Sequence, residues 1–171
     1  DGMTVSVAGE TLILPLAYVL EALQPKAEDI RTMAGEGRVL RVRGEYLPLI
    51  PLYQMFDITP RFTSPSEGIC VILETEGRKA ALFVDDLVGQ QQVVVKNLES
   101  NYRKVVGISG ATILGDGGVS LILYGLISAV GVRNVVENQV DFAKSRNVII
   151  AAMIMSLALG IHFSKAGAIV F

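Results

Sequence analysis

The feature that most constrains the fold is a series of short apolar segments separated by glycine-containing turns. MTVSV and TLILP flank Ala8-Gly9-Glu10, ICVILE and KAALFVDDL flank Thr75-Glu76-Gly77-Arg78, and GATIL and GVSLIL flank Gly115-Asp116-Gly117. Glycine supplies the positive φ that tight hairpin turns need, and Asp-Gly is a favoured pair in such turns. The pattern predicts three β-hairpins and indicates a mainly β protein, a barrel or a sandwich.

A further strand is indicated by RVLRVRG, in which apolar residues are broken up by Arg38, Arg41 and Arg43. The arginines are most simply explained as the solvated face of that strand. The next run, YLPLIPL, contains Pro48 and Pro51. Because proline cannot donate to a β-ladder, this run is predicted to be an edge strand or to contain a bulge.

The remaining stretches of the first 116 residues are shorter or more polar. QQVVVKNL (91–98) is another strand candidate. AYVLEAL (17–23) is predicted to be a short helix that ends before Pro25. TPRFTSPSEG (59–68) consists of turn formers and polar residues, so it is predicted to be a surface loop.

The charge distribution divides the chain near Asp116. Residues 1–116 hold 11 Lys/Arg and 15 Asp/Glu, whereas residues 117–171 hold 4 and 2. The density of charge therefore falls by about half, which predicts a boundary within the stretch GDGGVSLILYG (115–125). The overall net charge is −2, so nothing in the composition calls for a nucleic-acid partner.

No catalytic, cofactor or metal arrangement is indicated. Asp85 and Asp86 are neighbours on a predicted strand, where side chains alternate between faces, so we expect a solvated strand end rather than an acid–base pair. Cys70 lies in the apolar run ICVIL and is expected to be a buried small hydrophobe. GDGG lacks the lysine and hydroxyl residues of a phosphate loop, which favours a hairpin turn.

Two blocks resemble a known family. GRVLRVRGEYLPLIPLYQMF and GRKAALFVDDLVGQQQVVVKNLESNYRKVVGISGATILGDG resemble the C-terminal regulatory domain of the bacterial chemotaxis histidine kinases of the CheA family, and the likeness extends over residues 1–123. The resemblance implies a CheW-like fold of two small five-stranded β-barrels without catalytic activity. It also implies docking on the coupling protein CheW and on chemoreceptors, in the cytoplasm at receptor arrays.

The same resemblance suggests where partners would bind. Arg43-Gly44 matches the Arg-Gly turn that precedes the proline-containing strand in this family, and Tyr46 follows it. Arg43, Gly44 and Tyr46 are therefore candidate partner contacts. The alternative is that Gly44 serves only the turn and Arg43 only the rim of a barrel.

Two departures from the family accompany the match. The family has an apolar strand just before the segment DGM, so the first barrel is expected to lack its first strand here. After the last strand the family continues with a polar linker and a helix, whereas this chain continues with YGLISAVGVRN.

The last segment is unusually apolar. Residues 117–132 carry no charge, residues 133–146 are polar, and residues 147–164 contain only His162 as an ionisable group. A bilayer-spanning helix needs ~18–20 apolar residues, so membrane association through 147–164 is expected and the first run falls short. The alternative is a buried helix of a soluble protein. Near the end of its run, His162 is expected to be interfacial rather than a proton relay.

This segment also resembles a family. GGVSLILYGLISAVGVRNVVENQVDFAKSRNVIIAAMI resembles a late part of bacterial uracil permeases of the nucleobase–cation symporter family, over residues 117–171. The resemblance implies about two apolar α-helices. The substrate-binding glutamates of that family lie on earlier helices that are absent here, so the segment alone is expected not to transport.

The sequence therefore predicts two parts, a CheW-like domain (1–123) and a permease-like helical fragment (124–171), joined at a seam within 115–125. We expect 119–123 to form the last strand of the domain, which leaves 124–132 too short to cross a bilayer. Three hypotheses follow: a signalling scaffold with a foreign tail, a membrane fragment of a nucleobase permease, or a chimeric chain without a native function.

Overall fold

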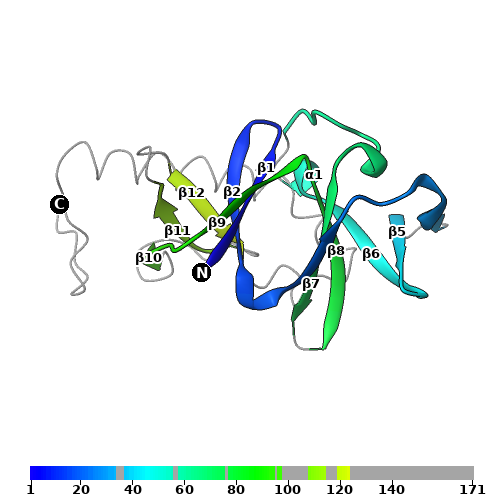
Figure 1. Cartoon of the computed structure of the whole chain (residues 1–171). Helices are drawn as coiled ribbons and strands as arrows, with labels where there is room; N and C mark the ends of the chain where they lie inside the picture. Colours follow the sequence, from blue (N-terminus) through cyan, green and yellow to red (C-terminus); the bar gives the residue numbers. More distant parts are fainter. Residues whose placement is uncertain are drawn as a thin grey trace.

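The structure is a computed structural model, and it describes residues 1–33, 37–55, 58–75, 77–94, 96–97, 108–114 and 119–123. Within these ranges the chain is mainly β, with one α-helix of four residues and three short 3₁₀ turns. Figure 1 shows two groups of strands side by side, β1, β2 and β9–β12 in one and β5–β8 in the other. The described part of the chain thus consists of two adjoining β-sheets.

The first sheet has six strands in the order β10-β11-β12-β2-β1-β9. All of its pairings are antiparallel except β12 with β2, which is parallel. Its strands are β1 (Gly2–Val7), β2 (Glu10–Pro15), β9 (Asp86–Gln91), β10 (Lys96–Asn97), β11 (Ile108–Ile113) and β12 (Val119–Leu123).

The second sheet also has six strands, in the order β3-β7-β8-β6-β5-β4. Here β6 and β8 are the parallel pair. Its strands are β3 (Val19–Leu23), β4 (Ile30–Met33), β5 (Gly37–Val42), β6 (Glu45–Pro51), β7 (Ile69–Thr75) and β8 (Arg78–Val84). The short helical elements are η1 (Leu16–Tyr18), η2 (Ala27–Asp29), α1 (Leu52–Met55) and η3 (Pro65–Glu67). The two β units that the resemblance implies are present, but each is a sheet of six described strands, so the expected number of five is wrong.

The predicted hairpins are present. Val7 pairs with Glu10 at the end of the β1–β2 ladder, and the two turn residues Ala8 and Gly9 have φ of 51° and 84°. Two successive positive φ values are typical of a type I′ turn, whose twist matches that of antiparallel strands. Strands β7 and β8 form the second hairpin and β11 and β12 the third.

Strands β7 and β8 are buried on both faces, which explains their continuous apolar runs. Val71 and Leu82 belong to a cluster shared with β1 and β2, whereas Ile72 and Phe83 face a second cluster under β5 and β6. The two strands therefore form a wall between two cores. Because the first cluster takes residues from both sheets, the sheets are packed together by hydrophobic burial rather than joined by a linker alone.

Strand β12 confirms the predicted last strand. It spans Val119–Leu123 and lies between β11 and β2. Ile122 and Leu123 are buried, and Leu123 contributes to the cluster shared by the two sheets. Residues 119–123 are therefore an interior part of the first sheet.

The helix predicted at 17–23 is wrong. Leu16–Tyr18 is a single 3₁₀ turn, and Val19–Leu23 is strand β3, which pairs antiparallel with β7. Exposed and half-buried residues alternate along β3, as in a strand with one face on a core. The sheet edge offered by β7 overrides the helix propensity of Leu, Glu and Ala in this stretch.

The edge position predicted for the proline-containing strand is also wrong, because β6 lies between β5 and β8. The strand changes partner along its length, which is what makes the prolines tolerable. Its first half, to Pro48, pairs with β5, and its second half, to Pro51, pairs with β8. Each proline stands at the end of a ladder, so neither interrupts the interior of one.

The two apolar helices predicted after residue 123 lie outside the described residues. So do the turn at Gly115-Asp116-Gly117, the segment 147–164 and His162. In the ranges that the structure does describe, no helix has the length and apolarity to cross a membrane.

Candidate functional site

The turn between β5 and β6 is the tip of a regular hairpin. Val42 pairs with Glu45, so the turn consists of Arg43 and Gly44, whose φ values are 50° and 86°. A Cβ added at Gly44 would meet nothing within 4 Å, so glycine is favoured there by the backbone conformation and not by space. Arg43 adopts the left-handed conformation without being glycine, which is uncommon.

Three ion pairs hold this hairpin against its surroundings. The Nη2 of Arg43 donates to Glu21 Oε2 on β3 at 2.9 Å. Lys79 Nζ on β8 donates to Glu45 Oε2 at 2.8 Å. The hydrogen bond to Glu45, with its charge, raises the pKa of Lys79. The hairpin is thus tied to two strands that are distant in sequence.

The third ion pair joins Arg41 to Asp29, in the 3₁₀ turn before β4. Arg41 donates to Asp29 Oδ1 from Nε at 3.1 Å and from Nη2 at 2.8 Å. Two donors of Arg41 thus converge on one oxygen of Asp29, and the hydrogen bond to Asp29 raises the pKa of Arg41. The side chain of Arg41 is therefore held in one orientation on the sheet surface.

Arg41 is directly opposite Tyr46 in the β5–β6 ladder, so their side chains share a face. The same face carries Arg31 and Val39, which are paired across β4 and β5, and Pro48 beyond them. We call this surface the outer face, and its residues are Arg31, Met33, Val39, Arg41, Tyr46 and Pro48. Tyr46 is 56% exposed and Met33 is 47% exposed. The outer face thus combines exposed apolar area with guanidinium groups.

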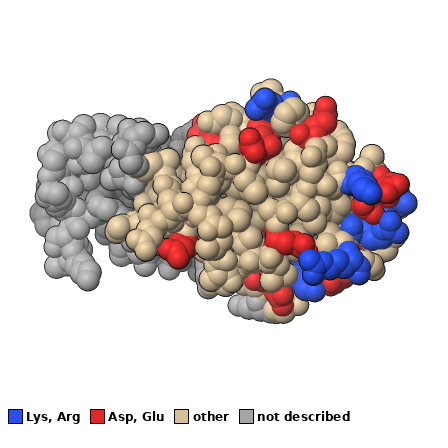
Figure 2. All heavy atoms as spheres, in the orientation of Figure 1, with Lys and Arg blue, Asp and Glu red and all other residues tan. Residues whose placement is uncertain are grey.

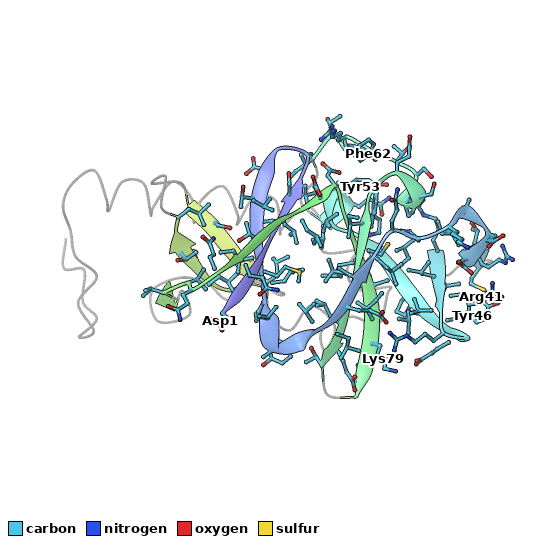
Figure 3. The ribbon with its side chains drawn as sticks, in the orientation of Figure 1. Asp1, Arg41, Tyr46, Tyr53, Phe62 and Lys79 are labelled. Carbon is cyan, nitrogen blue, oxygen red and sulfur yellow. The ribbon has the colours of Figure 1, made fainter. Side chains whose placement is uncertain are left out.

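The opposite face of these strands belongs to the core. Leu40 and Leu47, paired across β5 and β6, are both buried in the second cluster. Figure 3 shows Arg41 and Tyr46 together at the end of the molecule that is distant from β10–β12. Figure 2 shows most of the basic side chains at that same end, next to acidic ones, while further acidic side chains are spread over the rest of the described surface. The hairpin therefore has one face packed on the core and a charged rim.

The three arginines predicted to form one solvated face do not share a face. Arg38 lies three residues from Arg41 on β5, so it faces the other side. Its guanidinium donates to the Thr63 carbonyl at 3.2 Å and approaches the Tyr53 hydroxyl at 3.5 Å. Tyr53 in turn packs edge-to-face on Phe83, with ring centroids 6.2 Å apart. Arg38 therefore fastens the loop at 59–64 to the core.

Comparisons with known proteins show which family has this architecture. The model of a family described as "CheW-like domain" matches residues 1–125. The chain belongs to the CheW-like domain family.

Among the relatives of the CheW-like chain are chemotaxis proteins. It is 63% identical over 123 residues to chemotaxis protein CheA of Salmonella typhimurium, and 44% identical over 124 residues to CheA of Rhizobium meliloti. Each alignment covers 72% of this chain, but 18% and 16% of the respective relative. The chain therefore spans less than a fifth of the length of these relatives.

A solved structure supports the fold. The crystal structure of scaffolding protein TtCheW from Thermoanaerobacter tengcongensis aligns with a TM-score of 0.52 at 21% identity, and covers 72% of this chain and 87% of that one. A second family model, described as "Permease family", matches residues 111–167. The two family models thus overlap at 111–125.

For Asp85 and Asp86, the prediction of a solvated strand end is correct for only one of the two residues. Asp86 is exposed, but Asp85 is buried, so the expectation of a solvated strand end is wrong for Asp85. Asp85 Oδ2 accepts the Ala8 N–H at 2.6 Å, and its own N–H donates to the Ser6 carbonyl at 2.9 Å. Asp86 Oδ1 accepts the Leu87 N–H at 2.8 Å, so the two carboxylates bind different backbone groups.

Cys70 is fully buried in the second cluster, as predicted. Burial raises the pKa of its thiol to about 12, with a smaller opposing effect from Arg38. The protonated thiol is not a nucleophile at neutral pH. Among the described residues, no group of three or more His, Cys, Asp or Glu side chains could hold a metal ion.

The hairpin brings Arg43, Gly44 and Tyr46 together, but no local sequence pattern pointed to the ion-pair partners of the hairpin. Asp29, Glu21 and Lys79 come from three different elements. The pairing of β4 with β5 and of β6 with β8 accounts for the positions of Asp29 and Lys79, and the contact of the β5–β6 turn with β3 brings in Glu21. Met33 was missed because the strand that carries it was not predicted.

Proposed function

We propose that this chain is a non-catalytic scaffold domain of a chemotaxis histidine kinase, and that it docks on a CheW-type coupling protein and on chemoreceptors. The observation that carries the proposal is the 63% identity to a chemotaxis protein CheA across the whole CheW-like part. The proposed location follows from the partners, at chemoreceptor arrays on the cytoplasmic side of the membrane.

The outer face is the docking surface that the geometry favours. Tyrosine and arginine are the residues most often found as energetic centres of protein interfaces. Tyr46 offers a large, stiff side chain that is already more than half exposed, and Arg41 beside it is fixed by Asp29. Little side-chain entropy would be lost when a partner covers them, which favours binding.

Arg43 adds a projecting charge at the rim of this surface. Its side chain is 81% exposed although Nη2 is bonded to Glu21. The remaining guanidinium surface can therefore meet a carboxylate or carbonyl of a partner. We assign Arg43 and Tyr46 to the contact and Gly44 to the shape of the turn that presents them.

A binding experiment tests the proposal. The full chain is immobilised and titrated with a purified CheW coupling protein, and unrelated soluble protein serves as the control. We expect saturable binding by the coupling protein alone. Failure of a chain with a β-rich circular dichroism spectrum to bind the coupling protein would exclude the proposed role.

A second candidate function is supported by the permease model at 111–167, namely a fragment of a nucleobase permease. Transport sites of such proteins are built from several helices around the middle of the membrane, and a third of a short chain does not supply them. We therefore propose that the fragment does not transport by itself. Cells expressing the chain should show no uracil uptake above the level of cells with an empty vector.

The two family matches also bear on the origin of the chain. We propose that it joins a CheW-like domain to a permease-like segment at a seam within 115–125, where both family models match. Recovery of the same uninterrupted reading frame, with native flanking genes, from one genome would show instead a natural gene with this domain order.

A further inference from the structure

The charges of the outer face are only partly balanced within the described chain. Arg41 is paired with Asp29 at 2.8 Å. Arg31, on the same face, is exposed, and its Nη1 donates to the neighbouring Ile30 carbonyl at 3.4 Å, a long bond. Among the residues that the structure describes, no carboxylate pairs with Arg31. The outer face therefore carries one guanidinium with a counter-charge and one without.

Arg31 is bordered by apolar side chains. It lies directly opposite Val39 in the β4–β5 ladder, and Met33 follows two residues later on the same face of β4. Met33 is exposed and Val39 is half-buried. Side chains at this spacing along a strand lie ~7 Å apart, within reach of one partner surface. The cation and the apolar area thus form one continuous patch.

Covering this patch has a consequence for the partner. Removing a guanidinium from water is costly unless the group is paired and hydrogen-bonded. Arg41 brings Asp29 into the interface with it, whereas Arg31 brings no carboxylate from the described residues. The compensating acceptor must therefore come from the partner. A carboxylate fits best, because it accepts two parallel bonds from a guanidinium.

We propose that the partner presents a carboxylate that pairs with Arg31, next to apolar side chains that pack on Met33 and Val39. Arg31 is then a specificity-determining residue of the outer face. It favours an acidic and apolar partner surface over a basic one, because like charges brought together weaken association. This inference rests on the proposed docking to a CheW-type coupling protein and adds the chemistry of the surface that docks.

A charge series at one position tests the inference. The affinity of a purified CheW coupling protein is measured for the full chain and for Arg31→Lys, Arg31→Gln and Arg31→Glu. We expect Arg31→Gln to weaken binding by ~3-fold or more and Arg31→Glu by ~10-fold or more, with Arg31→Lys between Arg31→Gln and the unchanged chain. The loss in Arg31→Glu should shrink when salt is raised from ~50 to ~500 mM, because salt screens the charges.

Arg61→Glu is the matched control, because it alters the net charge by the same amount as Arg31→Glu. Arg61 is exposed and lies over the ring of Phe62, which Figure 3 shows well apart from Tyr46. Arg61→Glu should therefore leave the affinity within ~2-fold of the unchanged chain. An equal loss in Arg61→Glu and Arg31→Glu would show that net charge alone matters and would overturn the inference.

The series also separates this inference from the proposed function. Saturable binding by the unchanged chain with the same affinity in Arg31→Glu would overturn the inference and leave the proposed function standing. Absence of binding by the unchanged chain would remove both. Arg31 lies on β4, an edge strand, where a charge can serve only to prevent pairing with other chains. Self-association of Arg31→Gln in gel filtration, with unchanged affinity for the coupling protein, would establish that role instead.

Discussion

Asp85 and Ala8 are 77 positions apart, and the buried carboxylate of Asp85 accepts the backbone N–H of Ala8 at 2.6 Å. Asp85 stands between β8 of the second sheet and β9 of the first, and Ala8 stands in the turn between β1 and β2. This bond therefore fastens the corner at which the chain crosses from one sheet to the other. It also stabilises a turn residue whose φ is positive.

Removal of this carboxylate should destabilise the fold. Asp85→Ala leaves the half-buried Ala8 N–H without its partner, which typically costs about 1–3 kcal/mol of unfolding free energy. Asp85→Asn keeps an acceptor oxygen and should cost less. Urea unfolding followed by circular dichroism measures both. Equal stability of Asp85→Ala and the unchanged chain would show that water replaces the carboxylate without penalty.

Gly68 should be intolerant of a side chain for steric reasons. A Cβ at Gly68 would lie 2.5 Å from the Val84 carbonyl oxygen and 2.6 Å from the Phe83 ring. Because backbone and a buried ring cannot give way easily, Gly68→Ala should cost about 1–3 kcal/mol.

Gly2→Ala is the matched control for this steric effect. There the nearest atom, also at 2.5 Å, is the side-chain Cγ2 of Ile13. A side-chain methyl group adjusts more readily than backbone, so the loss of stability should be smaller. Equal losses in the two variants, measured by urea unfolding, would argue against this explanation.

Substitutions in the β5–β6 turn can separate the contribution of the turn to folding stability from its proposed contact with a partner. Gly44→Ala forces a side chain into a φ of 86° and should cost about 1–2 kcal/mol. Arg43→Asn creates Asn-Gly, the favoured sequence of a type I′ turn, and should leave the thermal midpoint unchanged or higher. Loss of stability in Arg43→Asn would show that its ion pair with Glu21 outweighs the turn preference.

The buried thiol predicts a decline of stability at alkaline pH. Burial raises the pKa of Cys70 in the folded chain from 9.0 to about 12, so above pH 9 the folded chain keeps a proton that the unfolded chain loses. The contribution of the protonated thiol to the unfolding free energy is therefore complete below pH 9. It is lost as the pH rises toward about 12, by at most ~1.4 kcal/mol for each pH unit.

Comparison with Cys70→Ala isolates this effect from other titrating groups. The difference in unfolding free energy between the unchanged chain and Cys70→Ala, measured in urea at pH 8, 9 and 10, should narrow as the pH rises. A difference that stays constant over this range would mean that the thiol ionises in the folded chain as easily as in the unfolded one.

Local rules were sufficient where a single turn determines the structure. The hairpins at Ala8-Gly9 and at Gly77 were predictable because positive φ and short loops leave few alternatives. Strand β12 was predictable for the same reason, since a short connection ties it to β11.

Predictions failed where a distant partner decides the outcome. Residues 19–23 form a strand because β7 offers an edge, and Asp85 is buried where its carboxylate accepts the Ala8 N–H. The ion pairs of the β5–β6 hairpin depend on the order of strands in the sheet, which no local pattern contains. The sequence therefore predicted the candidate site as a turn and a tyrosine, but not the charged residues that hold them in place.

The central claim is that this CheW-like chain docks on a coupling protein through the outer face. The most direct test is to measure the affinity of a purified CheW coupling protein for the unchanged chain and for Tyr46→Ala and Arg43→Asn. Val88→Ala is the control, because Val88 is 64% exposed but lies on β9 of the other sheet. We predict that Tyr46→Ala and Arg43→Asn each weaken binding by ~5-fold or more, about 1 kcal/mol, and that Val88→Ala does not. Unchanged affinity in both Tyr46→Ala and Arg43→Asn, or a loss of affinity only in Val88→Ala, would contradict the central claim.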